Sequence, residues 1–568
     1  MAVEPTPDGS RIEPYMSDTQ DREDSPSGHP PQFWLIIVAL SFLAFISAVD
    51  VTIIPPALPT ITQEIGGSKQ YVWIANSFVF ASTVPQPLVG QLSNIFGRKY
   101  PVVVSIVLFI VGSGIAGGAK NAATLIAGRA IQGVGAGGIY VLIDIVCCDL
   151  VPLRDRGKYL GIVNAWAGVA AGLGPVIGGL LAQANNWRWI FFLNIPICAL
   201  PLITILLFMK VKTGDGISHS IKKLDYLGNI IFIPSIISLL FGLVTGGIDY
   251  PWSSWRIILP LVLGIAGWIT FHFQQHFFTY GNNASVPSRL FSNRTSVAGY
   301  AMTFLSAVCL QTSGFFLPIY FQAVVGTTVA DSGIYFLPTT IGLLFFAAIG
   351  GVLLSKFGAY RPIHAASFAL SVIGYGLFTI LGQRTPKVAW AFFQLISAAG
   401  LGSTLTTILP AILVALPESD VASATAVFSF IKTFGFTWGV TIASIIFNAV
   451  FNNNLYSISS PALRDQLADG GAYSFASQAS NVIDTADDTA WGEARGVYIM
   501  SLKAVWWFGL GISAAGLLLV GMERHFELST ELKTEYGLSN DGQARPSEPN
   551  EVKGNGTVHC DPLPAPSL

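Results

Sequence analysis

The chain has 568 residues, of which 52% are hydrophobic, 12% are aromatic and only 11% are charged, and its mean hydropathy is +0.58. Soluble domains carry about 25% charged residues, so this composition excludes an ordinary soluble protein and indicates a membrane protein. The formal net charge is −2 and no basic cluster is present, so nothing points to a nucleic-acid partner.

Polar and apolar segments alternate along the chain. Residues 1–32 are polar and rich in Pro, Ser and Asp, which predicts a disordered tail and no cleaved signal peptide. A membrane helix needs about 20 apolar residues. Such runs fall at 33–56, 71–93, 101–119, 124–146, 159–182, 189–209, 226–246, 257–277, 297–325, 332–354, 362–382, 388–416, 421–450 and 498–521. They predict an all-α membrane protein with 14 transmembrane helices.

The spacing of these runs divides the chain into domains. We expect an N-terminal six-helix bundle at 33–209, a linker with an inserted helix pair at 210–285, and a C-terminal six-helix bundle at 286–521. An outer loop is expected at 452–496. Residues 522–568 are polar and contain prolines, which predicts a second disordered tail.

Positive charge predicts the orientation of the helices. One set of short loops contains Arg98, Lys99, Arg154, Arg156 and Lys158 among others, and the opposite set contains fewer Lys and Arg. Because Lys and Arg are enriched in cytoplasmic loops, both tails are expected in the cytoplasm, and the loop at 452–496 is expected outside.

An internal repeat supports a two-bundle transporter. Gly90–Gly97 ends the second apolar run and Gly351–Gly358 ends the tenth, with Gly, Leu, Phe and Gly at matching offsets. Pro101 and Pro362 then open the following runs. The repeat occurs at equivalent places in the two halves, so it predicts two similar bundles of six helices.

The most informative stretch is Gly172–Gly179, which reads Gly-Leu-Gly-Pro-Val-Ile-Gly-Gly within the fifth apolar run. Gly174, Gly178 and Gly179 let neighbouring helix backbones approach closely. Pro175 leaves a backbone carbonyl without its helical partner and bends the helix. We interpret the stretch as a pivot packed against another helix. A generic glycine-rich packing face is the alternative.

Four stretches resemble one family, the fourteen-span drug:proton antiporters of the major facilitator superfamily, and its fungal toxin and multidrug efflux members are the most similar. They are Asp50–Pro59, Gly90–Lys99, Leu125–Gly137 and Gly168–Gly179, the last followed by the string Trp187–Pro196. The resemblance extends over about 33–522. It implies the major facilitator fold, alternating access, and export of a substrate in exchange for protons.

The second stretch resembles the family's Gly-x-Leu-Ala-Asp-x-x-Gly-Arg-Lys loop. This implies a gating role for Gly90, Asn94, Gly97, Arg98 and Lys99. Asn94 stands where the family has Asp, and an amide can form hydrogen bonds but no ion pair. The alternative is a basic loop that only sets the topology.

Charged residues inside membrane helices mark functional candidates, because burying their charge costs several kcal/mol. Asp50 and Arg129 are candidates for proton coupling, and Gln132 and Gly133 belong to the motif that contains Arg129. The alternatives are a water-exposed helix end for Asp50 and a side chain that reaches the outer surface for Arg129. Asp144 either faces the central cavity, as a third coupling candidate, or approaches the inner surface.

Gln322 and Lys432 are candidates for the substrate cavity. For Lys432, binding or gating competes with simple packing near the end of a helix. His272 and His276 have the i, i+4 spacing of metal ligands, but no third ligand is near in sequence, so no metal site is expected.

The chain contains no phosphate loop, zinc motif, haem motif or nucleophile elbow in a suitable context, so neither an enzyme nor a cofactor is expected. We predict a proton-coupled efflux transporter for small amphipathic compounds, powered by the proton gradient. It is expected to act as a monomer in the lipid bilayer of the plasma membrane, with the vacuolar membrane as the alternative. The rival functions are a proton-coupled importer, such as a siderophore carrier, and a transporter-like receptor that moves no substrate.

Overall fold

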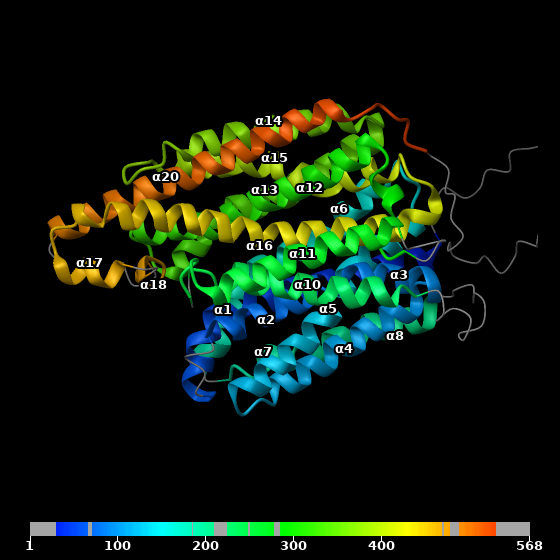
Figure 1. Cartoon of the computed structure of the whole chain (residues 1–568), viewed down its shortest axis with the longest axis horizontal. Helices are drawn as coiled ribbons and strands as arrows, with labels where there is room; N and C mark the ends of the chain where they lie inside the picture. Colours follow the sequence, from blue (N-terminus) through cyan, green and yellow to red (C-terminus); the bar gives the residue numbers. More distant parts are fainter. Residues whose placement is uncertain are drawn as a thin grey trace, which may run out of the picture.

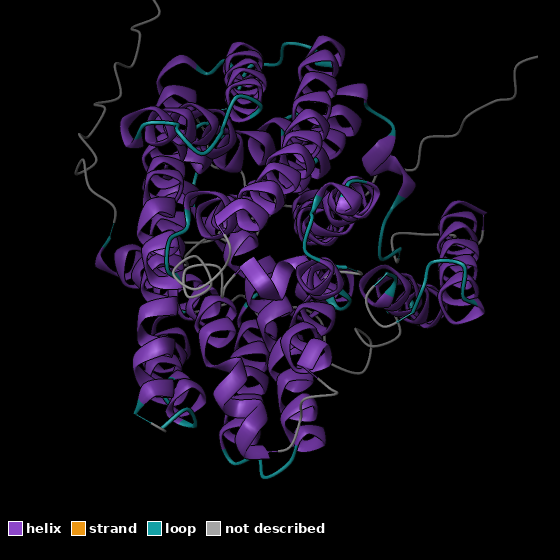
Figure 2. Cartoon of the chain, turned by 90° about the vertical axis from the view of Figure 1, so that its left-hand side faces the viewer, coloured by secondary structure: helices purple, strands orange, loops and turns teal. Residues whose placement is uncertain are grey.

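The structure, a computed structural model, describes residues 30–65, 71–184, 186–209, 224–247, 250–277, 284–468, 471–476 and 488–529. Within these ranges the regular elements are helices, apart from one β-bridge between Gly246 and Tyr250 (Figure 2). The predicted all-α architecture is confirmed. Most of the two predicted tails, 1–32 and 522–568, lies outside the described residues.

The helices follow the predicted apolar runs closely. The N-terminal half contains α1 (Pro31–Ile65), α2 (Tyr71–Thr83), α3 (Gln86–Phe96), α4 (Lys99–Gly117), α5 (Ala122–Leu150), α6 (Arg156–Gln183), α7 (Trp189–Phe192) and α8 (Asn194–Phe208). The inserted pair is α10 (Tyr226–Thr245) and α11 (Trp255–Phe277). The C-terminal half contains α12 (Arg294–Ile319), the π-helical η3 (Tyr320–Val325), α13 (Val329–Phe357), α14 (Tyr360–Phe378), α15 (Lys387–Leu413), α16 (Val421–Asn453), α17 (Pro461–Leu467), α18 (Gly471–Ala476), α20 (Asp488–Leu519) and η6 (Val520–Met522).

Twelve helical stretches among the described residues are long and apolar enough to cross a membrane. The other two predicted spans fall on different kinds of helix. The run at 71–93 is divided into α2 and α3 at Val84 and Pro85, and α14 carries Arg361 and His364 near its start. The protein is therefore a multi-pass membrane protein, whereas the count of 14 spans stays a prediction.

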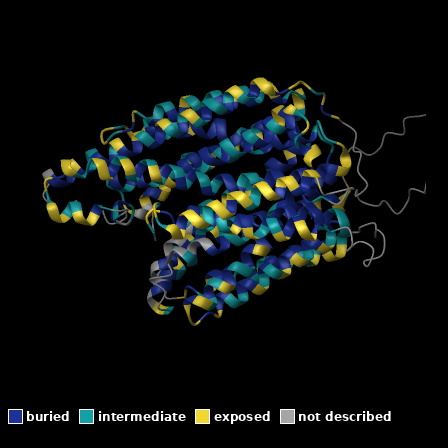
Figure 3. Cartoon of the chain, viewed as in Figure 1, coloured by how far each residue is buried: buried dark blue, intermediate teal, exposed yellow. Residues whose placement is uncertain are grey.

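The two halves form two adjacent helical layers, and α10 and α11 lie across the boundary between them (Figure 1). We call the end where α1 begins and η6 ends the tail end, and the end that carries α17 and α18 the loop end. The tail end is on the right in Figure 1. The inside of each layer is buried, and exposed Leu207, Ile230 and Val262 suit contact with lipid (Figure 3).

Aromatic contacts attach the inserted pair to both halves. The ring centroids of Phe232 and Phe430 lie 5.2 Å apart, which places α10 against α16. Trp73 of α2 and Phe241 of α10 lie 5.4 Å apart. The inserted pair therefore covers a seam between the bundles.

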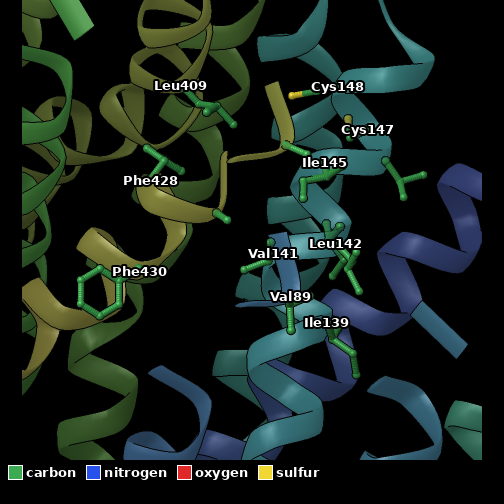
Figure 4. Close-up of a cluster of buried hydrophobic side chains, with 14 of the residues drawn as sticks. Val89, Ile139, Val141, Leu142, Ile145, Cys147, Cys148, Leu409, Phe428 and Phe430 are labelled. Carbon is green, nitrogen blue, oxygen red and sulfur yellow. The ribbon is translucent and has the colours of Figure 1, made fainter. Parts of the chain in front are cut away.

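A continuous apolar core crosses the bundle boundary. Its buried members include Val89 of α3, Leu142 and Ile145 of α5, Leu409 of α15 and Phe428 of α16 (Figure 4). Because these side chains come from both halves, the core stabilises the arrangement in which the two bundles meet.

Candidate functional site

Asp50 of α1 and Arg129 of α5 form an ion pair deep inside the N-terminal bundle. The side chain of Asp50 is fully buried and that of Arg129 is 2% exposed. These positions exclude the two alternatives from the sequence, a water-exposed helix end for Asp50 and a surface-reaching side chain for Arg129. Burying two charges is costly unless further hydrogen bonds compensate; the Asp50 carboxylate has such bonds, whereas Arg129 Nε has no hydrogen-bond partner among the described residues.

Neutral donors complete the shell of the Asp50 carboxylate. Gln132 Nε2 donates to Asp50 Oδ1 at 2.7 Å, and Asn194 Nδ2 donates to the same oxygen at 2.9 Å. Gln132 Nε2 also lies 2.9 Å from Ser113 Oγ, and Gln132 Oε1 accepts from Arg129 Nη1 at 2.9 Å. Helices α1, α4, α5 and α8 of one bundle thus supply a single buried polar group, which we call the Asp50 cluster.

Aromatic rings cover the cation of the Asp50 cluster. The guanidinium carbon of Arg129 lies 4.3 Å from the ring centroid of Phe78, a favourable cation–π distance. A Cβ on Gly133 would approach the backbone oxygen of Phe78 to 2.5 Å, so the glycine permits α5 to pack closely on α2. The close packing of the two helices at Gly133 therefore brings Phe78 over Arg129.

The glycine-rich stretch of α6 packs against α1 directly beside the Asp50 cluster. A Cβ added at Gly174 would overlap Thr52, and one added at Gly178 would overlap the backbone of Ile53. Gly179 has nothing within 4 Å of its added Cβ, so it plays no part in this contact. The side chain of Pro175 lies outside the described residues. The predicted close contact is thus made by two of the glycines.

A second polar group links the bundles at the tail end. Arg98 Nε donates to Asp149 Oδ2 at 2.7 Å, and Arg98 Nη1 donates to Asn94 Oδ1 at 3.1 Å. Asn94 Nδ2 in turn donates to Ser423 Oγ of α16 at 3.1 Å. The amide at position 94 therefore connects the arginine of one bundle with the other bundle without a charge of its own.

The glycines of the same loop allow a close helix contact and a tight turn, while their predicted gating role stays a prediction. A Cβ on Gly90 would overlap Ala426 of α16, so the glycine permits α3 to touch the C-terminal bundle. Gly97 has φ 76°, a left-handed conformation that favours glycine. Lys99 Nζ donates to the backbone oxygen of Leu206 at 2.8 Å and attaches the loop to α8.

The start of α6 and the end of α13 form the other half of the closed tail end. Arg154 Nε donates to the backbone oxygen of Ser355 at 2.6 Å, and its Nη2 donates to that of Lys356 at 2.9 Å. Gly157 and Gly351 allow the two backbones to come into contact. The tail end is therefore closed on both sides of the bundle interface.

Residues Glu523–Ser529, which we call the C-terminal strap, fasten this closed end. Glu523 is buried against His364, with Oε1 and Nδ1 2.8 Å apart, and the Arg524 N–H donates to Thr295 Oγ1 at 3.0 Å. The backbone N–H of Arg154 donates to the Ser529 oxygen at 3.1 Å, across the bundle boundary. Within the tail predicted at 522–568, Glu523–Ser529 are therefore held by contacts with the helices.

The loop end carries a smaller polar contact outside the membrane stretch of α1. Arg188 Nη1 and Trp187 Nε1 both donate to the carboxylate of Glu64, the latter at 2.6 Å. The hydrogen bond from Arg188, followed by that from Trp187, lowers the pKa of the Glu64 carboxyl. This contact ties the end of α1 to the string before α7.

Asp144 and Lys432 face each other across the bundle boundary. Asp144 of α5 is 8% exposed and accepts a hydrogen bond from Ser429 Oγ of α16 at 3.3 Å. Lys432, also on α16, is the cation whose charge acts on Asp144. Asp144 therefore lies inside the protein at the interface rather than at the inner surface.

Lys432 lines a cavity in the C-terminal bundle. The walls come from α12, α15 and α16 and include Thr303, Ser306, Thr404, Phe428 and Phe436. Gln322 is elsewhere, in η3, where its Nε2 donates to Ser332 Oγ at 2.9 Å. Of the two predicted cavity residues, the structure thus places only Lys432 at this cavity.

No group of three or more metal-ligating side chains occurs in the ranges that the structure describes. The rings of His272 and Trp268 lie 5.9 Å apart, and His272 also contacts Phe271 and Phe291. His272 is therefore part of an aromatic group formed by α11 and Phe291.

The profile of the Major Facilitator Superfamily matches residues 40–440, which is more than half of the chain. The chain belongs to the Major Facilitator Superfamily. The matched range includes the Asp50 cluster, the tail-end contacts of Asn94 and Arg98, and Lys432. The family assignment thus rests on the same region that carries the polar groups described above.

Curated relatives align with this superfamily member along almost its whole length. The MFS efflux transporter aclA of Aspergillus oryzae is 41% identical over 529 residues, which cover 92% of this chain and 95% of that protein. The MFS-type transporter gkaD of Penicillium citrinum is 40% identical, with 92% and 89% covered. The efflux pump FUS6 of Gibberella fujikuroi is 37% identical, with 96% and 98% covered.

Solved structures of the superfamily share the fold. The proton:xylose symporter XylE matches with a TM-score of 0.50 and 13% identity, over 84% of this chain and 96% of that one. The human organic anion transporter MFSD10 matches with a TM-score of 0.50 and 14% identity, over 84% and 100%. At this identity the likeness shows the fold alone.

In this superfamily member the sequence identified the charged groups but not all of their partners. Ser113 and Asn194 complete the Asp50 cluster, and Ser429 bonds to Asp144. Asn194 lies in the Trp187–Pro196 string, whose resemblance to the family's sequences could have identified it as a candidate. Ser113 and Ser429 are small polar residues in apolar helices, and nothing in their spacing distinguishes them from ordinary packing residues.

Proposed function

We propose that this superfamily member is a proton-coupled efflux transporter that exports small amphipathic compounds, such as toxins or secondary metabolites. Relatives named as efflux transporters or pumps align with 92% or more of the chain, which supports export. The observation that carries the proton coupling is the buried Asp50 carboxylate. It accepts hydrogen bonds from a cation and from two neutral amides.

The Asp50 cluster has the chemistry that a proton carrier needs. When Asp50 takes up a proton, it loses its charge attraction to Arg129, while Gln132 and Asn194 still offer hydrogen bonds to the neutral acid. The carboxyl group therefore stays solvated by the protein in both protonation states. Arg129 keeps its charge in both states and then depends on Gln132 and the Phe78 ring.

Helix α6 connects the Asp50 cluster mechanically with the closed tail end. Near one end, Gly174 and Gly178 of this helix contact Thr52 and Ile53 of α1, which are two and three residues after Asp50. Near the other end, Gly157 of the same helix touches Gly351 of α13. A shift of α1 on protonation would therefore move α6 and loosen the tail-end contact.

The tail end corresponds to the cytoplasmic side if the loop charges set the orientation. The structure then represents a state closed to the cytoplasm, in which a substrate would be released outside. We place the transporter in the plasma membrane, with the vacuolar membrane as the alternative, as a monomer that uses the proton gradient and no cofactor. In this orientation, tags at Met1 and Leu568 should be cytoplasmic and a tag near Asp484 should be outside the cell. A tag near Asp484 that is protected in intact cells would contradict the orientation.

Reconstituted vesicles test the proposed function. The purified chain is inserted into proteoliposomes, and a panel of anionic, neutral and cationic amphipathic compounds is supplied outside. An acidic interior should drive accumulation of at least one compound without ATP, and a protonophore should abolish that accumulation. Accumulation that persists after the pH gradient has collapsed would contradict proton coupling.

A further inference from the structure

The cavity beside Lys432 has one charged group among the described residues that line it. Lys432 is partly buried, and its ammonium group forms no hydrogen bond or ion pair with any residue that the structure describes. The ring of Phe428 lies beside it, with Nζ 5.3 Å from the ring centroid. A partly buried ammonium group that has no carboxylate in direct contact gains from an added counter-ion, so this site attracts an anion.

The hydroxyl groups of the cavity cannot replace the lysine as donors. Thr303 donates to the backbone oxygen of Gly299 at 2.8 Å, Ser306 to that of Thr303 at 3.0 Å, and Thr404 to that of Leu401 at 2.7 Å. Their hydrogens are occupied, and only their lone pairs remain for a ligand. Lys432 is thus the donor that this wall offers to an acidic group.

The nearby acid does not neutralise Lys432 by direct contact. Asp144 attracts it through space, but the hydrogen bond of Asp144 comes from Ser429, on the facing helix α16. A carboxylate that enters the cavity can therefore reach the ammonium without displacing an existing ion pair. The rings of Phe428 and Phe436 lie on the same wall and offer apolar surface to the body of the ligand.

We propose that this cavity binds amphipathic organic anions, with Lys432 as the counter-ion of a substrate carboxylate. The inference rests on the proposed function and adds a substrate class to it. An amine would meet a like charge at Lys432, and a neutral amide would lose the charge-assisted hydrogen bond, which is stronger than a neutral one. The cavity is small in this state of the protein, so the selection that we propose is by charge.

Three probes that share one apolar body test this selectivity. The purified full chain in lipid nanodiscs is titrated with 1-pyrenebutyrate, its primary amide and 1-pyrenebutylamine, without a pH gradient, and binding is followed by fluorescence. We expect the carboxylate to bind about tenfold more tightly than the amide, and the amine to bind most weakly. Equal affinities, a preference for the amine, or no binding by any probe would overturn the inference.

Variants assign the selectivity to one side chain. Lys432→Met should remove the preference for the carboxylate, while affinity for the amide stays within about twofold and shows that the cavity is intact. Lys432→Arg should keep the preference. Lys503→Met, at an exposed lysine on α20, is the matched control and should change nothing. A carboxylate preference that survives in Lys432→Met would contradict the inference, whereas gradient-driven export is a separate measurement and can stand or fail independently.

Discussion

The carboxylates of Asp50 and Asp144 are both buried in the N-terminal bundle, but they have different kinds of partner. Asp50 is bonded to Arg129, Gln132 and Asn194, all from its own bundle. Asp144 is bonded to Ser429 and attracted by Lys432, both from the opposite bundle. Relative movement of the bundles leaves the first set of contacts in place and must change the second. Asp50 is thus suited to hold a proton, and Asp144 to respond to the state of the interface.

Among the substitutions that test this comparison, Arg129→Ala should have the largest effect on stability and export. The change leaves Asp50 buried without its cation, which costs about 3–5 kcal/mol of stability. We expect lower expression, a lower melting temperature of the purified protein and loss of export. Arg129→Lys keeps the charge but loses the planar fork, and should retain the fold with weaker coupling. A stable, active Arg129→Ala variant would show that the ion pair is dispensable.

Gly178→Ala should have the next largest effect, because it separates α6 from α1 beside the Asp50 cluster. The added methyl group overlaps the backbone of Ile53, and overpacking of this kind costs about 1–3 kcal/mol. We expect reduced export at a near-normal protein level. Gly179→Ala is the matched control, since its Cβ meets nothing within 4 Å. Equal export by the two variants would show that the close contact has no role in transport.

Asp144→Asn should have the smallest effect on coupling. The amide keeps a hydrogen-bond partner for Ser429 and removes only the negative charge that acts on Lys432. We expect the pH-gradient dependence of export to persist, with rates within about threefold of the unmodified chain. Binding of a carboxylate probe should become tighter, because Lys432 has lost its competing acid. Loss of gradient dependence in this variant would transfer the coupling role to Asp144.

The sequence predicts the charged members of these sites well, for a physical reason. A charge in an apolar run is costly, so Asp50, Arg129 and Lys432 are conspicuous. Ser113 is not, because a serine can bond to its own helix backbone and needs no distant partner. The pairing of Asp144 with α16 rather than with the inner surface depends on how the two bundles dock, and no local pattern encodes that.

The fold is predicted with similar limits. Hydropathy finds the helices, but it does not reveal that α2 and α3 are separate or that α14 begins at Tyr360, before the predicted run at 362–382. The C-terminal strap is polar, which resembles a disordered tail in composition. It is ordered by contacts to Thr295, His364 and Arg154, residues far away in the sequence. Long-range contacts of this kind leave no periodic signal.

The central claim is that the proton of the transport cycle is carried by Asp50. Asp50→Asn fixes this position in a neutral form that resembles the protonated acid, while Gln132 and Asn194 remain beside it. The measurement compares, in the same vesicles, substrate exchange at equal pH with uptake driven by an imposed pH gradient. The account predicts that exchange continues and gradient-driven uptake stops. Full gradient-driven uptake by Asp50→Asn would contradict it.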